Sequence, residues 1–408
     1  MTLHLHWFLP TSGDSRDVVG AGHASADPVL GDAPLGTPGR RAVPREPDIE
    51  YLAQVARSAE QLGFEAVLTP TGTWCEDAWL TTAALTRETT RLKFLVAFRP
   101  GLITPTLAAQ MAATYQRLSR GRLLLNIVTG GDVAEQRRFG DWLDHDERYE
   151  RTGEFLTVLR GAWSGKPFDF TGRHYTVAGA TVSRPPQPQP QLFFGGASPA
   201  AQEVAAAHVD TYLTWGEPPE AIARQLDRVR TLAAAHGRSL TFGIRLHVIS
   251  RDRASDAWAE ADRLLEAMDP QVIALAHRRM TDADSIGQRR MAALHNGSRE
   301  NLEIYPNLWA GFGLVRGGAG TALVGSHEQV AERIEEYHAL GLDHFVLSGQ
   351  PHLEEAYWFG EGVRPLLAAR GLLGHLPTRP DPDLPSDHVR RSTPAPATPH
   401  APPSRGPG

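Results

Sequence analysis

Short apolar runs alternate with longer amphipathic stretches along the 408 residues of this chain. Such alternation is typical of a parallel sheet whose strands are joined by helical crossovers. The predicted strands are the eight apolar runs 3–9, 66–69, 92–98, 123–128, 192–194, 211–215, 240–249 and 344–348. The predicted helices include 49–62, 105–118, 147–163, 218–236 and 328–340, the last with Ser326 as its N-cap. Eight β/α units favour an α/β fold of the TIM (β/α)8 barrel type, and a doubly wound open sheet is the alternative.

Three segments interrupt this alternation. Residues 11–47, rich in Gly, Pro, Ala and Asp, form a long predicted loop of the kind that is functional or disordered. Residues 280–325 mix glycine with apolar residues and one arginine, as a mobile lid would. The tail 376–408 is dense in Pro, Ser and Thr and is predicted to be disordered. The expected organisation is therefore one barrel domain over 1–375, with insertion loops, followed by the tail.

The composition narrows the class of partner. A formal net charge of -6 without a dense Lys/Arg tract favours neither nucleic acid nor an anionic membrane, so a small molecule is expected. Cys75 is the single cysteine, which excludes an intrachain disulfide and fits a cytoplasmic location. The start MTLHLHWFLPT lacks the features of a signal peptide, and no apolar run approaches the roughly 20 residues that span a bilayer.

The stretch FGIRLHVIS, residues 242–250, places two cationic side chains inside a predicted strand. Arg245 and His247 share one face of that strand, because successive side chains point to opposite sides. Neither face of a barrel strand is freely solvated. A buried arginine is costly unless it meets an anion, so Arg245 indicates either an internal ion pair or an oxyanion ligand. His247 is either a hydrogen-bonded core residue or a group that moves a proton.

Three further side chains are candidates of weaker standing. Arg316, in GLVRGGAGT, is an exposed loop arginine or a second cation that folds over a site. Cys75, in TGTWCEDAW, is a small buried hydrophobe, a pocket wall or a nucleophile. Trp215, at the end of the sixth strand, packs at the barrel rim or against a flat ring.

Glycine-rich turns follow several of the predicted strands. The turns are IVTGGD at 127–132, FFGGAS at 193–198 and VLSGQP at 346–351. They are ordinary βα turns, or they let backbone N–H groups approach a phosphate on the active-site face of a barrel. No P-loop, nucleophile elbow, dinucleotide fingerprint or His/Cys metal spacing is found, so no metal is expected.

These motifs stand in longer blocks of sequence. The blocks are HWFLPT, TGTWCEDAW, RLKFLVAFRPG, YLTWGEPPE, FGIRLHVI, MAALHNG, NLWAGFGLVRGGAGTALVG and LSGQPHLEEAY. Together they resemble the reduced-FMN-dependent alkanesulfonate monooxygenases of the bacterial-luciferase-like family, from the first strand to about Gly371. The resemblance implies a luciferase-like TIM barrel and a homo-oligomer. It also implies a two-component system, in which an NAD(P)H-dependent FMN reductase supplies reduced FMN and oxygen then cleaves an organosulfonate to an aldehyde and sulfite.

The same resemblance implies roles for individual residues. Arg245 and Arg316 would contact the sulfonate or the peroxide, with Arg316 on the lid, and His247 would organise hydrogen bonds and proton traffic. Cys75 would help to hold flavin, and Trp215 would shape its pocket. The implied contacts of the FMN phosphate are Thr129, Tyr149, Gly195, Gly196 and Ser198.

Two positions depart from the pattern of that family. Gln350 stands where the sulfonate enzymes usually have tyrosine, and Ser12 stands where they tend to have histidine. A glutamine donates and accepts hydrogen bonds but has no phenolic proton. The sequence therefore leaves open three alternatives to desulfonation. They are the same flavin and oxygen chemistry on another substrate such as a sulfone, a deazaflavin-dependent oxidoreductase, and a barrel that only stores flavin.

Overall fold

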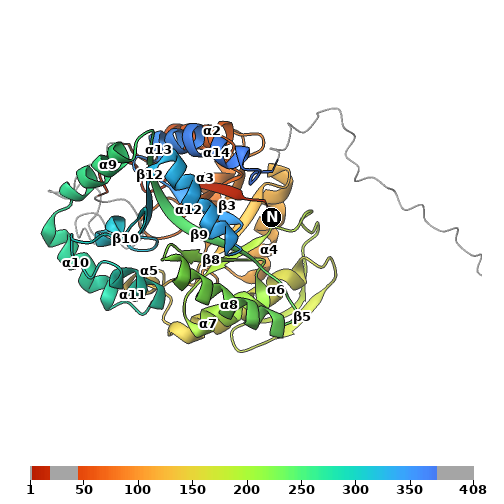
Figure 1. Ribbon diagram of the computed structural model, residues 1–408. Coiled ribbons are helices and arrows are strands. Elements are labelled where there is room, and N and C mark those ends of the chain that lie inside the picture. The colour runs from red at the N-terminus through yellow and green to blue at the C-terminus, as the bar shows by residue number, and fades with distance from the viewer. Residues whose placement is uncertain (1, 19–44, 375–408) are drawn as a thin grey trace, which may run out of the picture. The chain divides into compact units, whose positions relative to one another are not determined.

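A computed structural model of the chain describes residues 2–18 and 45–374 (Figure 1). Eight parallel strands form a closed barrel with helices between them. The strands are β1 (His4–Phe8), β2 (Ala66–Thr69), β3 (Lys93–Phe98), β4 (Leu123–Ile127), β7 (Leu192–Gly195), β8 (Thr211–Trp215), β9 (Thr241–Arg251) and β13 (His344–Ser348). Around the barrel their order is β9-β13-β1-β2-β3-β4-β7-β8, and the pairing of β8 with β9 closes the ring. The predicted TIM barrel is thus confirmed, and the open sheet is wrong.

The predicted strands agree with the observed ones to within two residues at every end. The predicted helices also form. They are α2 (Ile49–Gln61), α4 (Pro105–Ser119), α6 (His145–Ala162), α8 (Pro219–Ala235) and α12 (His327–Ala339). The Ser326 hydroxyl accepts a hydrogen bond from the Gln329 backbone N–H 3.3 Å away. In return, the Gln329 side-chain oxygen accepts from the Ser326 backbone N–H. Ser326 is therefore the N-cap of α12, as its sequence context indicates.

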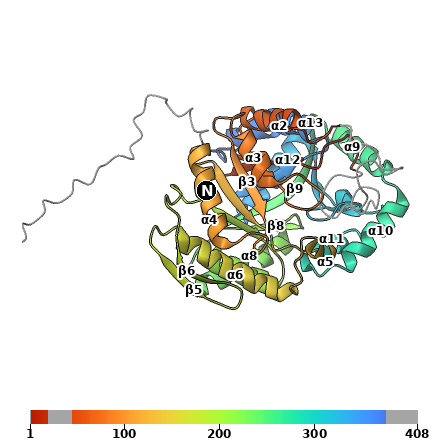
Figure 2. The same ribbon diagram turned by 180° about the vertical axis from the view of Figure 1, so that it is seen from behind.

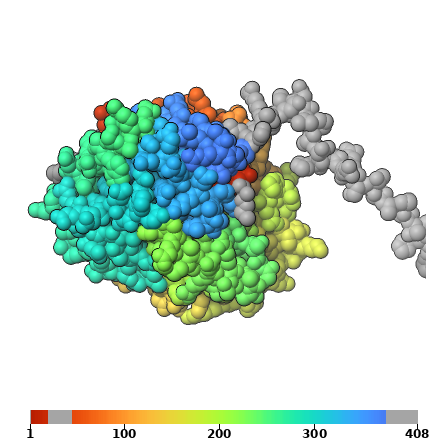
Figure 3. Space-filling model, in the orientation of Figure 1, coloured from red at the N-terminus to blue at the C-terminus, as the bar shows by residue number. Residues whose placement is uncertain are grey.

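Further helices complete the outer ring (Figure 2). They are α3 (Ala78–Leu85), α5 (Val133–Arg138), α7 (Pro199–His208), α13 (His352–Trp358), the π-helical turn η2 (Phe359–Val363) and α14 (Arg364–Ala369). On the face shown in Figure 3, the green and blue segments form a continuous surface over the strands. No helix within the described part of the chain is both long enough and apolar enough to cross a membrane.

Apolar side chains cover the strands on both sides. Inside the barrel a compact group fills the lumen: Phe8, Ala66, Leu68, Leu95, Leu124, Phe193, Leu213 and Val346. Outside it, a larger core joins the strands to the helices and includes Ile244, Leu246 and Val248 from β9. Leu246 and its neighbours thus face the helices, while Arg245 takes the opposite face, as the alternation of strand side chains predicts.

The largest insertion lies between β9 and α12. It contains α9 (Ala254–Glu266), α10 (Pro270–Thr281), α11 (Ile286–Ala293), β10 (Glu303–Tyr305), β11 (Leu308–Trp309), the 3-10 turn η1 (Gly311–Leu314) and β12 (Ala322–Ser326). Strand β12 pairs in parallel with the second half of β9, Ala322 beside His247. Residues 308–325 are buried almost throughout. The glycine-rich half of the predicted lid is therefore a packed wall, because its small residues allow close backbone contact.

Two other predictions concern segments that the structure describes in part or not at all. Of the predicted loop 11–47, residues 11–18 and 45–47 are described, and Asp14 pairs with Arg45 in an isolated β-bridge. The predicted tail 376–408 lies outside the described residues. A short hairpin of β5 (Phe168–Thr171) and β6 (Thr176–Ala180), which the sequence pattern did not indicate, follows α6.

Candidate functional site

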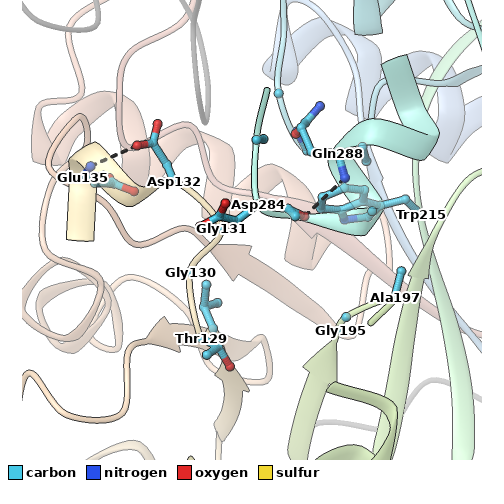
Figure 4. A pocket seen from close by; sticks show the side chains of 18 of the residues that line it. Thr129, Gly130, Gly131, Asp132, Glu135, Gly195, Ala197, Trp215, Asp284 and Gln288 are labelled. Atoms are coloured by element: carbon cyan, nitrogen blue, oxygen red, sulfur yellow. Dashed lines mark hydrogen bonds between the residues drawn. The ribbon is translucent and has the colours of Figure 1, made fainter. Parts of the chain in front are cut away.

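A cavity of about 780 Å³ opens at the carboxyl ends of the barrel strands (Figure 4). Its volume lies in the range of pockets that bind small molecules and cofactors. Eight of the ten residues singled out from the sequence line it: Thr129, Tyr149, Gly195, Gly196, Ser198, Trp215, Arg245 and Arg316. His247 and Cys75 do not line it. The barrel thus brings together residues that lie as far apart in the sequence as Thr129 and Arg316.

Arg245 projects from β9 toward the lumen and is buried. Its guanidinium donates to the Ser348 hydroxyl at 2.8 Å and to the Leu246 carbonyl at 3.0 Å, and its Cζ lies 4.7 Å from the centre of the Phe8 ring. No carboxylate among the described residues forms an ion pair with it. Burial first, and then repulsion from Arg316, hold the pKa of Arg245 well below its usual value. Within residues 2–18 and 45–374, the internal ion pair that the sequence left open is not formed.

Arg316 follows η1 and is also buried, so it is not an exposed loop residue. Its Cζ lies 5.6 Å from the centre of the Phe8 ring, and its Nη1 has no hydrogen-bond partner among the described residues. Burial lowers the pKa of Arg316 to about 10, and the charge of Asp14 opposes this shift. Two guanidiniums therefore share one aromatic ring, without a carboxylate to neutralise them, at the wall of the cavity. Such a pair suits a bound oxyanion.

His247 lies behind this pair rather than in the cavity. Its ring stacks on Phe312 at 4.2 Å, its Nδ1 lies 2.7 Å from the Ser348 hydroxyl, and its Nε2 lies 3.1 Å from the Ala319 carbonyl. Since a carbonyl only accepts, Nε2 carries the proton and Nδ1 accepts from Ser348. Burial, reinforced by Arg316 and Arg245, holds the pKa of His247 well below its usual value. A neutral His247 therefore fixes the Ser348 hydroxyl that supports Arg245.

The turn after β7 leads into α7 and forms another part of the cavity wall. The Ser198 hydroxyl caps α7 by accepting from the Ala201 amide at 3.2 Å. A Cβ at Gly196 would lie 2.5 Å from the Ala201 methyl, so only glycine fits there. Tyr149, from α6, stands 3.4 Å from the same point. Backbone donors at a helix start beside a phenol and a hydroxyl have the chemistry of a phosphate cradle.

The turn after β4 continues the cavity wall toward α5. Thr129 is buried, its hydroxyl has no hydrogen-bond partner among the described residues, and its carbonyl accepts from the Gln136 amide at 2.9 Å. In Figure 4, Thr129 and Gly130 lie below Asp132 and face the strand end that carries Gly195. An unpartnered buried hydroxyl costs free energy unless a ligand or water satisfies it, so Thr129 fits a polar ligand.

Residues 278–288, from the end of α10 to the first turn of α11, cover the cavity, and all but the first two of them lie within the predicted lid 280–325. They line it continuously except at Thr281. A Cβ at Gly287 would lie 3.1 Å from the Trp215 ring, so the start of α11 sits on that ring (Figure 4). This stretch carries charged residues, which are typical of an exposed connection between helices, so its sequence was only a weak signal for a cavity cover.

Cys75 lies outside the cavity, on the turn after β2. Its sulfur contacts the Gly72 carbonyl at 3.7 Å. Burial raises the pKa of the Cys75 thiol to about 12, and the charge of Glu135 adds to this effect. A thiol of this kind is protonated at neutral pH, which argues against the nucleophile that the sequence left open.

A buried polar network beside the arginines was missed. Asp14 accepts from the backbone N–H of His352 at 2.8 Å, from its Nδ1 at 3.0 Å, and from the Tyr51 hydroxyl. Gln350 donates to Asp14 at 3.2 Å and to the Ser15 carbonyl at 2.5 Å. Burial opposes ionisation of Asp14, but its bonds to His352 and Tyr51 keep its pKa below the usual value.

The position of Gln350 changes what its departure from the family pattern means. Its side chain is buried and does not line the cavity. The Gln350 side chain joins the segment after β1 to the turn after β13. Ser12, the other residue that departs from the family pattern, does line the cavity. Neither residue was a signal for Asp14 or His352, which lie 338 positions apart and meet only because β1 and β13 are neighbours in the barrel.

No group of three or more His, Cys, Asp or Glu side chains within residues 2–18 and 45–374 is placed to hold a metal ion. The cavity instead combines a cationic wall, an aromatic rim at Trp215 and two glycine-rich turns. These features suit an organic cofactor with a phosphate at one end and a small anion at the other.

The fold is shared with several solved structures. A riboflavin lyase crystallised with modified FMN and riboflavin is similar with a TM-score of 0.74 and 20% identity, covering 92% of this chain and 93% of that one. A long-chain alkane monooxygenase is similar with a TM-score of 0.72 and 20% identity, covering 92% and 93%. An F420-dependent secondary alcohol dehydrogenase, bound to an F420-acetone adduct, has a TM-score of 0.63 and 17% identity, covering 89% and 99%. At these identities the likeness shows the fold.

The profile of one family matches most of the chain. That family is described as luciferase-like monooxygenase, and the match runs over residues 6–344, from β1 to the first residue of β13. It includes the six barrel strands from β2 to β9, most of β1 and every residue singled out at the cavity. The chain belongs to the luciferase-like monooxygenase family.

Proposed function

We propose that this protein is the oxygenase of a two-component system that uses reduced FMN and O2 to desulfonate aliphatic sulfonates. The overall reaction is RCH2SO3⁻ + FMNH2 + O2 → RCHO + HSO3⁻ + FMN + H2O, so one oxygen atom enters the aldehyde and the other enters water. The observation that carries the proposal is the pair Arg245 and Arg316, buried at the cavity wall without an ion-paired carboxylate in the part of the chain that the structure describes. A small oxyanion such as a sulfonate would supply the missing charge.

The cofactor end of the cavity fits a flavin phosphate. Ser198 and the backbone of Gly196 at the start of α7, with Tyr149 and the unpartnered hydroxyl of Thr129, would hold it. Trp215 would border the ring system. When bound, reduced FMN supplies the electrons that activate O2. A soluble NAD(P)H-dependent FMN reductase would deliver it, and we further expect a cytoplasmic homo-oligomer.

The chain's own residues would bind the anion and control water and protons. The Arg245 fork is held by Ser348, which neutral His247 orients in turn, so the cation is preorganised. Phe8 excludes water from the inner side of both guanidiniums. The cover 278–288 and Trp215 close the outer side. A dry site strengthens the attraction between the arginines and a sulfonate.

A panel assay tests the proposal. Purified protein mixed with chemically reduced FMN, O2 and alkanesulfonates of increasing chain length is expected to release sulfite above the protein-free control. Arg316→Met should abolish the release, whereas Arg253→Met, at an exposed arginine on the outside of the barrel, should leave it unchanged. Reduced-FMN binding without sulfite from any sulfonate would instead indicate the same oxygen chemistry on another substrate, such as a sulfone.

The fold of the F420-dependent dehydrogenase gives a reason to test a second cofactor. A deazaflavin-dependent oxidoreductase would bind reduced F420 and would not need oxygen. Titration of the protein with reduced FMN and with reduced F420 separates the two, and we expect tighter binding of FMN. Tight flavin binding without product from any substrate in a single turnover would indicate flavin storage.

A further inference from the structure

The segment that carries Arg316 is held by few contacts of its own side chains. Arg316 is followed by Gly317 and Gly318, and Gly318 has a φ of +84°. A Cβ at Gly318 would meet nothing within 4 Å, so glycine is needed there for its conformation rather than for space. Since two glycines bring no side chains, the position of this segment depends on bonds to its backbone.

One of these bonds comes from the cover of the cavity. The Gln288 side-chain oxygen accepts a hydrogen bond from the Gly318 backbone N–H at 2.8 Å. Gln288 is buried and lies in the first turn of α11. The N-cap of this helix is Ser285, whose hydroxyl accepts a hydrogen bond from the Gln288 backbone N–H at 3.2 Å. The residue therefore joins α11 directly to the segment after Arg316.

The chemistry of this bond fixes the orientation of the Gln288 amide. A backbone N–H only donates, so the side-chain oxygen must face Gly318 and the Nε2 must point away from it. Nε2 is buried and has no hydrogen-bond partner among the described residues. The side-chain NH2 of Gln288 is thus buried without a partner among the described residues, which is unfavourable. The bond between its side-chain oxygen and Gly318 offsets part of this cost.

Other restraints lie on either side of Gly318, among them the Gly313 backbone N–H, which donates to the Gly320 carbonyl at 2.8 Å. The Arg316 backbone N–H donates to the Phe312 carbonyl at 3.0 Å, and the Ala319 carbonyl accepts from His247. The Arg316 guanidinium, by contrast, is placed by its contact with Phe8 and by the backbone that carries it. Among the described residues, the bond to Gln288 is the side-chain hydrogen bond that the Gly318 backbone makes.

We propose that Gln288 is a positioning residue for Arg316, which holds the guanidinium in register with Arg245 for the anion. This inference rests on the proposed function for the identity of the anion. The structural part of the inference does not depend on which anion binds. Loss of the Gln288 acceptor loosens residues 316–320 and lowers the affinity for any anion bound between the two arginines. Gln288 itself lines the cavity, and the proposal is that it acts through Arg316 rather than on the anion directly.

Hydrogen exchange measures the structural step without a ligand. In full-length Gln288→Met, amide exchange of the peptide that contains residues 316–320 should become faster, while Gln271→Met should leave it unchanged. Gln271 is a matched control, because it lies on α10 in the same insertion and its side chain is exposed. Unchanged exchange in folded Gln288→Met would overturn the proposal.

A double-mutant cycle measures the functional step. Binding of octanesulfonate to protein saturated with reduced FMN, kept anaerobic so that no turnover occurs, should weaken about fivefold in Gln288→Met, the effect of one neutral hydrogen bond. In the Arg316→Met background the same change should have no further effect. Gln288→Glu, which keeps an acceptor for Gly318, should restore the slow exchange of residues 316–320.

The outcomes separate the two proposals. Additive losses in the cycle would mean that Gln288 does not act through Arg316 and would overturn the inference. Faster exchange in Gln288→Met, in a protein whose unsubstituted form binds no octanesulfonate, would uphold the positioning role and contradict the sulfonate as substrate.

Discussion

Arg316 and Arg245 place two cations in a barrel wall where burial disfavours charge, and this arrangement favours binding over stability. Replacing Arg316 with methionine removes a buried charge that lacks a carboxylate partner and keeps the apolar stem. We expect Arg316→Met to raise the free energy of unfolding by about 1 kcal/mol while it weakens anion binding, which Arg245 alone then supports. Urea unfolding measures the first effect and titration with a sulfonate the second.

Arg99 is the matched control for that substitution, because its buried guanidinium does pair with a carboxylate, that of Glu135. Arg99→Met leaves Glu135 buried without its partner and should lower the free energy of unfolding by about 3 kcal/mol. Loss of stability in both variants would show that the environment of Arg316 supplies a counter-charge of its own.

Cys75 gives a second prediction at this scale. Because burial raises the pKa of its thiol to about 12, the reactive thiolate is scarce at pH 8. Alkylation of the folded protein by iodoacetamide at pH 8 should be at least about tenfold slower than in urea. The chain has a single cysteine, so one mass measurement reports on it alone. Equal rates in both states would contradict the prediction and mean that burial does not suppress the reactivity of Cys75, and a faster rate in the folded protein would indicate an activated thiol.

At the scale of elements, the start of α7 combines a structural and a proposed functional role. Ser198→Ala removes the N-cap and should cost about 1 kcal/mol of stability. If the same hydroxyl contacts the flavin phosphate, the variant should also lose affinity for FMN but not for riboflavin, which lacks the phosphate. Fluorescence titration with both flavins measures the ratio.

Ser326→Ala provides the comparison, because Ser326 caps α12 in the same way and does not line the cavity. It should lose a similar free energy of unfolding without any change in the FMN-to-riboflavin ratio. A change of that ratio in both variants would trace the effect to helix stability rather than to a phosphate contact.

For the whole molecule, buried histidines set the response to acid. Burial lowers the pKa of His6, His208 and His295 to about 4, and it also holds the pKa of His344 well below its usual value. The unfolded chain binds these protons near pH 6.5, so stability is lost as the pH falls from about 6.5 toward 4. His6 alone accounts for roughly 3 kcal/mol at the lower limit.

The carboxylates act in the same direction. Asp14 and Glu65 have lowered pKa values in the folded state, Glu65 through His4, His6 and Lys93 against the effect of burial, and lose their contribution as they are protonated. The urea midpoint should therefore stay level between pH 8 and 7 and fall steeply below pH 6. A level midpoint down to pH 5 would show that these histidines are protonated in the folded barrel.

Much of the fold could be read from the chain because its signals are local. Each barrel strand is a short apolar run, and each crossover is amphipathic, so the eight units and the cap at Ser326 follow from neighbouring residues. Strand β12 was missed because it follows a glycine-rich segment of the insertion that resembles a loop. Strands β5 and β6 were missed because they are short and mostly exposed.

The candidate site, too, has features that follow from the local sequence and others that depend on the tertiary structure. The sequence by itself determined which residues have unusual chemistry: an arginine in a strand, glycine pairs after strands, an aromatic at a rim. Only the tertiary structure decided which of them meet, because closure of the barrel brings Asp14 to His352 and Arg245 to Arg316 across long stretches of chain. It also decided that His247 and Cys75 lie behind the cavity wall, since burial depends on packing from distant elements. Local pattern specifies elements and candidate chemistry, whereas distance between groups is a property of the closed barrel.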